Sequence, residues 1–118
     1  MSGRPWLPPL VWAAIILVLT TIPVPQAVSV PGGDKTAHVL MYAVLGFLTM
    51  RAAWRAHAPS RSILLVVLAI AAFGAFNEVW QGFVGRSPEL LDWFADVVGA
   101  SLGAMAAAVQ IRARERYT

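Results

Sequence analysis

The sequence predicts an all-α integral membrane protein, a bundle of four transmembrane helices with both termini in the cytoplasm. Three observations predict this class: the composition, the number of apolar segments and the distribution of basic residues. Of the 118 residues, 58% are hydrophobic and only 13% are charged, and the mean hydropathy is +0.68. A soluble domain of this length needs a polar surface over most of its residues. This composition does not provide one, so lipid is the expected solvent.

Four apolar segments are separated by short connections. A helix needs roughly 20 apolar residues to cross the hydrocarbon core, so the chain has room for about four crossings and no second domain. Short connections favour antiparallel neighbours. We therefore expect one domain over residues 1–118, with helices over about 6–22, 36–54, 62–83 and 93–111.

The first segment has the weakest helical pattern. Pro8 and Pro9 fit the first turn of a helix, where proline is tolerated, and Pro23 ends the segment. A cleaved signal peptide is the competing interpretation, because Arg4 precedes an apolar stretch of suitable length. Small residues do not occupy the positions that a cleavage site requires, so we favour an uncleaved helix.

The basic residues predict the orientation of the bundle. Seven of the nine would share one side, and only Lys35 and Arg86 fall on the other. The positive-inside rule then places both termini in the cytoplasm. Because topology explains the net charge of +3, we expect no nucleic-acid partner. The absence of cysteine excludes disulfides and thiolate metal sites. The seven residues are Arg4, Arg51, Arg55, Arg61, Arg112, Arg114 and Arg116.

Acidic residues have the opposite bias, and they lie at helical spacing with other polar residues. Acidic residues contribute little to topology, so their clustering needs another cause. A charged Asp at the membrane centre costs about 2.5 to 3.5 kcal/mol on insertion scales, so we expect these side chains to converge inside the bundle. The helical rise of about 1.5 Å per residue places them in one layer near the outer surface. Residues three or four apart share a helix face: Asp34, His38 and Tyr42, then Glu78 and Gln81, then Asp92 and Asp96.

Structural roles are open alternatives for several of these residues. Asp34 and Asp92 are suited to the N-termini of their helices, where a carboxylate is favourable. Glu78 and Asp96 are alternatively the acidic partners of Lys35 or Arg86 in ion pairs between helices. Ionisable residues within membrane segments are nevertheless functional hypotheses by default.

Gly99 and Gly103 form a ridge of small residues on the fourth predicted helix. Such a ridge allows close approach of a second helix. The partner is either a neighbouring helix of the bundle or a second copy of the chain. We favour packing within the bundle and keep an oligomer as the alternative.

The ordered polar motifs resemble those of the VanZ-like membrane family. They are Asp34-Lys35-x-x-His38-x-x-x-Tyr42, Glu78-x-x-Gln81, Gly85-Arg86 and Asp92-Trp93-x-x-Asp96, and they cover about residues 34–103. A longer segment between Arg86 and Asp92 is a departure from some relatives. The resemblance implies a multi-pass protein of the bacterial cytoplasmic membrane, acting in the cell envelope. The named member of the family is associated with antibiotic resistance, as reduced susceptibility to teicoplanin.

The first functional hypothesis is a non-enzymatic protein that binds membrane lipids or a lipid-linked cell-wall precursor by the headgroup, in the outer leaflet. Lys35 and Arg86 would contact phosphate, since guanidinium and ammonium groups both bind it. The excess of carboxylates is the weakness of this hypothesis, because they repel phosphate unless paired. The full ligand-binding set would be Asp34, Lys35, His38, Tyr42, Glu78, Gln81, Arg86, Asp92 and Asp96.

Two further hypotheses use the same residues. In a membrane-embedded hydrolase or transferase, Glu78 or Asp96 would be the general base, with His38 as its proton-transfer partner. Alternatively, these three residues and Asp92 would hold Mg²⁺ or Mn²⁺, cations that prefer oxygen ligands. A translocation path for lipid or protons ranks third, because few polar residues continue towards the cytoplasmic ends of the helices.

Overall fold

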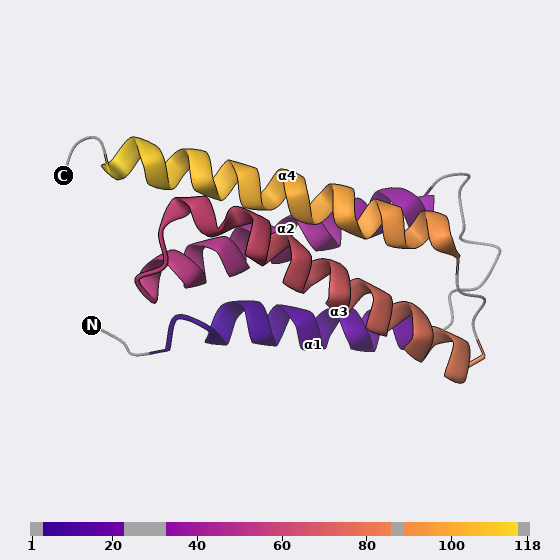
Figure 1. Ribbon diagram of the computed structural model, residues 1–118. Coiled ribbons are helices and arrows are strands. Elements are labelled where there is room, and N and C mark those ends of the chain that lie inside the picture. The colour runs from indigo at the N-terminus through magenta and orange to yellow at the C-terminus, as the bar shows by residue number, and fades with distance from the viewer. Residues whose placement is uncertain (1–3, 23–32, 86–88, 116–118) are drawn as a thin grey trace.

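The computed structural model describes residues 4–22, 33–85 and 89–115. Within this part of the chain, the fold is all-α, and successive long helices run in opposite directions (Figure 1). The bounds agree closely with the predicted ones, except that α2 begins three residues earlier and α4 is longer at both ends. The helices are α1 (Leu7–Thr21), α2 (Gly33–Arg55), α3 (Ile63–Phe83) and α4 (Leu90–Glu115), with a short 3-10 helix, η2 (Ser60–Ser62), before α3.

Three helices of the described chain are long and apolar enough to cross a membrane: Lys35–Arg55, Ser60–Phe83 and Leu90–Glu115. The chain is therefore a multi-pass membrane protein. The helix α1 is apolar but has only 15 residues. That length corresponds to about 22 Å, less than the hydrocarbon thickness of about 30 Å. A crossing by α1, the fourth in the predicted bundle, is thus not shown.

Large apolar side chains cover the outside of the bundle. On α3, Leu65 is 70% exposed and Phe83 is 80% exposed, and on α4 Val109 is 68% exposed. Contiguous apolar surface of this extent is rare on soluble monomers. Hydrocarbon is therefore the solvent that this surface fits.

The helices α2 and α4 make the most extensive contact of the bundle. A Cβ atom added to Gly99 would overlap the carbonyl oxygen of Val39, and one added to Gly103 would overlap that of Ala43. The paired residues advance together along both helices, so α2 and α4 run parallel. Gly99 and Gly103 therefore pack against α2 within the bundle.

Tryptophan side chains tie the other helices to this pair. The indole N–H of Trp12 on α1 donates to the carbonyl oxygen of Met41 at 2.9 Å. The indole of Trp93 on α4 donates to the carbonyl of Ala71 on α3, also at 2.9 Å. Helix α1 and helix α3 are thereby fixed against the α2–α4 core.

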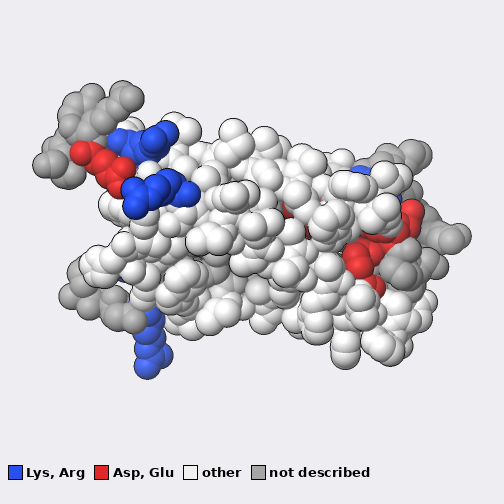
Figure 2. Space-filling view, viewed as in Figure 1, with Lys and Arg blue, Asp and Glu red and all other residues white. Residues whose placement is uncertain are grey.

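The two ends of the bundle differ in charge. Both termini lie at the same end, as the up-and-down arrangement requires (Figure 1). Arg side chains gather at that end, here called the basic end, and most Asp and Glu at the other, the acidic end (Figure 2). The single lysine, Lys35, lies at the acidic end beside Asp92. The charge asymmetry predicted from the sequence is thus present, while the structure does not say which end faces the cytoplasm.

Replacement of Gly103 tests the close α2–α4 contact. We expect Gly103→Val to lower the free energy of unfolding in detergent by about 1 to 3 kcal/mol or more, because an added side chain forces the backbones apart. The matched control is Ala106→Val on the exposed face of α4, which should cost only a few tenths of a kcal/mol through helix propensity. Equal stability of the two variants would contradict the contact.

Candidate functional site

Polar side chains from α2, α3 and α4 are buried together at the acidic end of the bundle. None of them is more than 8% exposed, and Asp96 and Asn77 are fully buried. In a membrane helix, each such group needs a partner inside the protein. This set, called the polar cluster below, contains His38, Tyr42, Asn77, Glu78, Gln81, Asp92 and Asp96.

The centre of the polar cluster is a contact between α2 and α4. His38 Nδ1 lies 2.6 Å from Asp96 Oδ1. With Asp96 ionised, Nδ1 is the donor in this contact, because a carboxylate only accepts hydrogen bonds. His38 Nε2 lies 4.0 Å from Asp92 Oδ2, which is beyond hydrogen-bond distance. The carboxylate of Asp96 therefore fixes the orientation of the imidazole ring.

Lys35 closes the cluster towards the surface. Its Nζ lies 2.8 Å from Asp92 Oδ1 and 3.3 Å from Glu89 Oε2. Asp92 is in the first turn of α4, where a carboxylate is also favoured by the helix dipole. Lys35 thus pairs with Asp92 and Glu89 at the rim. The ion pair that the sequence suggested with Arg86 lies outside the described residues.

Three buried carboxylates have an oxygen without a hydrogen-bond partner among the described residues. In Asp92 that oxygen, Oδ1, is in the ion pair with Lys35, which leaves Glu78 and Asp96 with an oxygen that has neither kind of partner. Glu78 Oε2 accepts the backbone N–H of Glu89 at 3.0 Å, but Glu78 Oε1 has no partner in the described chain. The same holds for Asp96 Oδ2. That atom would lie 3.1 Å from a Cβ added to Gly74, so the side chain of Asp96 packs closely against α3 at a position where glycine avoids crowding.

A neutral hydrogen-bond chain links the cluster to α1. Asn77 Nδ2 donates to the hydroxyl oxygen of Tyr42 at 3.3 Å, and Thr20 Oγ1 donates to Asn77 Oδ1 at 3.0 Å. The rings of His38 and Tyr42 are nearly parallel, with centroids 6.5 Å apart. Because a buried amide must be satisfied, this chain holds α1, α2 and α3 in one register.

Three members of the polar cluster have the geometry of metal ligands. His38, Glu78 and Asp96 each offer one ligand atom, and these atoms lie within 4.8 Å of one another. They come from three different helices, so the fold and not a local loop defines their spacing. Asp92, the fourth residue of the predicted cation set, faces Lys35 instead.

The structure brings together most, but not all, of the residues selected from the sequence. Lys35, His38, Tyr42, Glu78, Gln81, Asp92 and Asp96 lie at the acidic end. The side chain of Asp34, in the first turn of α2, and all of Arg86 lie outside the described residues.

Sequence reasoning did not select Asn77, Thr20 or Gly74 for the site. Asn77 lies four residues before Gln81, so the helical spacing that indicated Gln81 also indicates Asn77. Thr20 ends an otherwise apolar segment, and nothing in its neighbours signals a contact with Asn77. The part played by Gly74 is visible only from its close contact with Asp96 in the folded chain.

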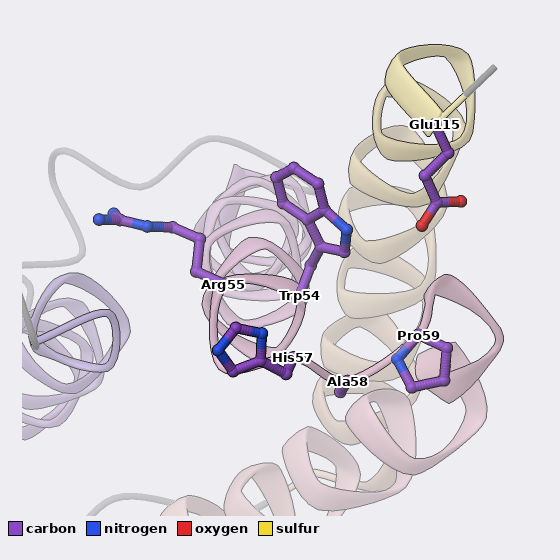
Figure 3. A pocket seen from close by; sticks show the side chains of 6 residues that line it. All are labelled: Trp54, Arg55, His57, Ala58, Pro59 and Glu115. Carbon is purple, nitrogen blue, oxygen red and sulfur yellow. The ribbon is translucent and has the colours of Figure 1, made fainter. Parts of the chain in front are cut away.

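Two hollows on the surface lie apart from the polar cluster. One, of about 460 Å³, is at the basic end (Figure 3); there Arg55 points away from Trp54 and Glu115. Its polar residues are exposed, so nothing in it resembles a desolvated site. The other is an apolar groove of about 380 Å³ between α1 and α3, lined by Leu17, Val18, Thr21, Ile22, Phe76 and Trp80.

The interior towards the basic end is apolar. Ile70, Met50 and Ile111 are at most 4% exposed and belong to the core. Ser101 donates its hydroxyl to the carbonyl of Val97 in its own helix, at 2.8 Å. In the described chain, the polar cluster therefore ends inside the bundle.

Fold and site together define a multi-pass helical membrane protein with a buried histidine–carboxylate cluster at one end. The model of the VanZ/LLP1 family matches residues 7–111, and the chain belongs to that family. The match confirms the resemblance and extends it over the first helix, which carries no polar motif. Comparison with curated proteins and with solved structures gave no match.

A double-mutant cycle tests the His38–Asp96 contact. With His38→Leu and Asp96→Asn, we expect a coupling free energy of about 1 to 3 kcal/mol in detergent unfolding, since buried partners are strongly coupled. The control cycle is Lys35→Met with Glu89→Gln, whose coupling should stay below about 1 kcal/mol because the pair is partly exposed. Equal coupling in the two cycles would contradict the buried contact.

Proposed function

We propose that this protein binds the polar headgroup of a membrane lipid or lipid-linked cell-wall precursor in the polar cluster, from the outer leaflet. The observation that carries the proposal is the convergence of buried ionisable groups from three membrane helices at one end of the bundle. Burial of such groups in a membrane is costly, and it typically marks a functional site.

The chemistry of the cluster supports a headgroup as the ligand. Carboxylates and the His38–Asp96 pair accept hydrogen bonds from hydroxyl or ammonium groups, which lipid headgroups and sugar-linked precursors carry. Lys35 at the rim contributes a cation near Asp92 and Glu89. A phosphate group can bind next to these acids when a cation binds together with it, because the cation offsets the repulsion between phosphate and carboxylates.

The apolar groove between α1 and α3 supports a ligand that also has an acyl or prenyl chain. Thr21 and Trp80 line the groove and are joined by a hydrogen bond of 2.9 Å. Thr20, next along α1, belongs to the hydrogen-bond chain that reaches Tyr42 through Asn77. We place the hydrocarbon chain of the ligand in this groove, with its headgroup at the polar cluster.

The orientation of the protein follows from its charges. The positive-inside rule places the basic end, and with it both termini, in the cytoplasm of a bacterial cell. For that topology α1 must also cross the membrane as the fourth span. The polar cluster then faces the extracytoplasmic side. This placement agrees with the family's association with reduced susceptibility to teicoplanin.

A hydrolase or transferase is the second candidate, and the His38–Asp96 contact favours it. A carboxylate that holds Nδ1–H leaves Nε2 free to act as a general base, the arrangement found in histidine-dependent hydrolases. The substrate would be the same headgroup, with water or an acceptor hydroxyl as nucleophile. Release of phosphate or transfer of the headgroup by the purified protein would distinguish this candidate from binding alone.

Single-cysteine labelling tests the orientation, because the chain has no cysteine of its own. With an impermeant thiol reagent on intact cells, we expect labelling of Val84→Cys at the acidic end. We expect Ala56→Cys and Ala113→Cys at the basic end, and Pro5→Cys before α1, to react only after permeabilisation. Labelling of Pro5→Cys from outside would exclude the crossing by α1.

Photo-crosslinking tests the headgroup proposal. In nanodiscs, we expect a photoactivatable lipid-linked precursor or phospholipid to label the wild-type protein. Glu78→Gln and Asp96→Asn should reduce labelling about tenfold, equivalent to a loss of about 1.4 kcal/mol in binding. The control Glu89→Gln removes an equal charge from an exposed position. Equal labelling of all variants, with unchanged teicoplanin susceptibility at equal abundance in cells, would overturn the proposal.

A further inference from the structure

The two carboxylate oxygens without partners belong to residues that already have metal-ligand spacing. Asp96 is fully buried and Glu78 is 8% exposed, and each has one oxygen in contact with a donor and one without. A buried acceptor without a partner costs about 1 to 3 kcal/mol, and more when it is charged. The fold must therefore offer these oxygens something that the described side chains do not supply.

We propose that His38, Glu78 and Asp96 bind a divalent transition-metal cation, Mn²⁺ or Zn²⁺. Each residue contributes one atom, and the three atoms lie within 4.8 Å of one another. Ligands about 2.1 Å from a shared ion are at most about 4.2 Å apart. A small closure of the three side chains completes the site.

The charge balance of the described residues also favours a cation. Two carboxylates, those of Asp92 and Glu89, lie at the rim and pair with Lys35. The two inner carboxylates, Glu78 and Asp96, face His38. A divalent ion between these three residues removes the repulsion between the inner acids and the cost of their burial.

The donor set selects among the metals. An imidazole nitrogen with two carboxylates suits Mn²⁺ and Zn²⁺, whereas Mg²⁺ prefers oxygen ligands and retains its water. The sequence suggested Mg²⁺ or Mn²⁺, with Asp92 among the ligands. Because the structure places His38 in the ligand set and Asp92 outside it, Mn²⁺ is favoured over Mg²⁺. In a role that rests on the proposed function, the bound ion would bridge the carboxylates to a headgroup phosphate.

Metal binding to the full-length protein in detergent, without added lipid, tests this inference. After treatment with EDTA and its removal, the protein is titrated with Mn²⁺ and free Mn²⁺ is followed by electron paramagnetic resonance. We expect one saturable site per chain, from which Zn²⁺ displaces Mn²⁺ and Mg²⁺ does not at equal concentration. Glu78→Gln and Asp96→Asn should weaken binding about 100-fold, because changes of even outer-shell partners cost about 10- to 100-fold.

Controls separate loss of the site from loss of the fold. Glu89→Gln removes a carboxylate at the same end without touching the ligand set, and it should bind Mn²⁺ as the wild type does. Tryptophan fluorescence and gel filtration report whether each variant is folded, and Glu78→Asp keeps the carboxylate if Glu78→Gln does not fold. Absence of a saturable site in the wild type, equal affinity in all folded variants, or equal competition by Mg²⁺ would overturn the inference.

The lipid experiment remains a separate measurement. Mn²⁺ binding without crosslinking to lipid would leave the metal site standing and remove the headgroup function. Crosslinking to lipid that persists in EDTA, together with no saturable Mn²⁺ site, would support the headgroup function and overturn the metal site.

Discussion

The parallel contact between α2 and α4 is the constraint on which the rest of the structure depends. Glycines at 46, 99 and 103 leave no room for a side chain between the two backbones. Because apolar side chains gain little by leaving lipid for one another, close van der Waals packing of this kind is a main source of helix association in a membrane. The same contact aligns the first turns of the two helices and brings His38 against Asp96.

The polar cluster then determines how the other two helices sit. Glu78 on α3 accepts the backbone N–H of Glu89, just before α4. Asn77 reaches both Tyr42 on α2 and Thr20 on α1. Each of these hydrogen bonds satisfies a group that lipid cannot satisfy. The polar cluster thus holds the helices together and is also the candidate site. The two roles are compatible because both require side chains in fixed positions.

Helix positions and the polar layer could be predicted from sequence, while the pairing within that layer could not. Hydropathy defines the segments, and helical spacing places His38 and Tyr42, or Asp92 and Asp96, on one face. Neither property says which face of α4 meets α2. The small residues Gly99 and Gly103 marked the approach, but their partners Val39 and Ala43 are ordinary apolar residues. The contact of Thr20 with Asn77 is therefore seen only in the structure. The same holds for the pairing of Asp92 and Glu89 with Lys35, and of Asp96 with His38.

The position of the cluster along the bundle bears on what the protein does. A transport path needs polar groups along the whole thickness of the membrane, or a movement that exposes the site to both sides. Here the layers beyond Tyr42 are filled by Met50, Ile70 and Ile111. The glycine contacts hold α2 and α4 together over the same stretch, which opposes a large separation of the two helices. Apolar core residues thus lie beneath a charged cluster whose hydrogen-bonding groups are only partly paired. Such a site is suited to holding a polar group that enters from one side. This geometry favours binding or headgroup chemistry over translocation.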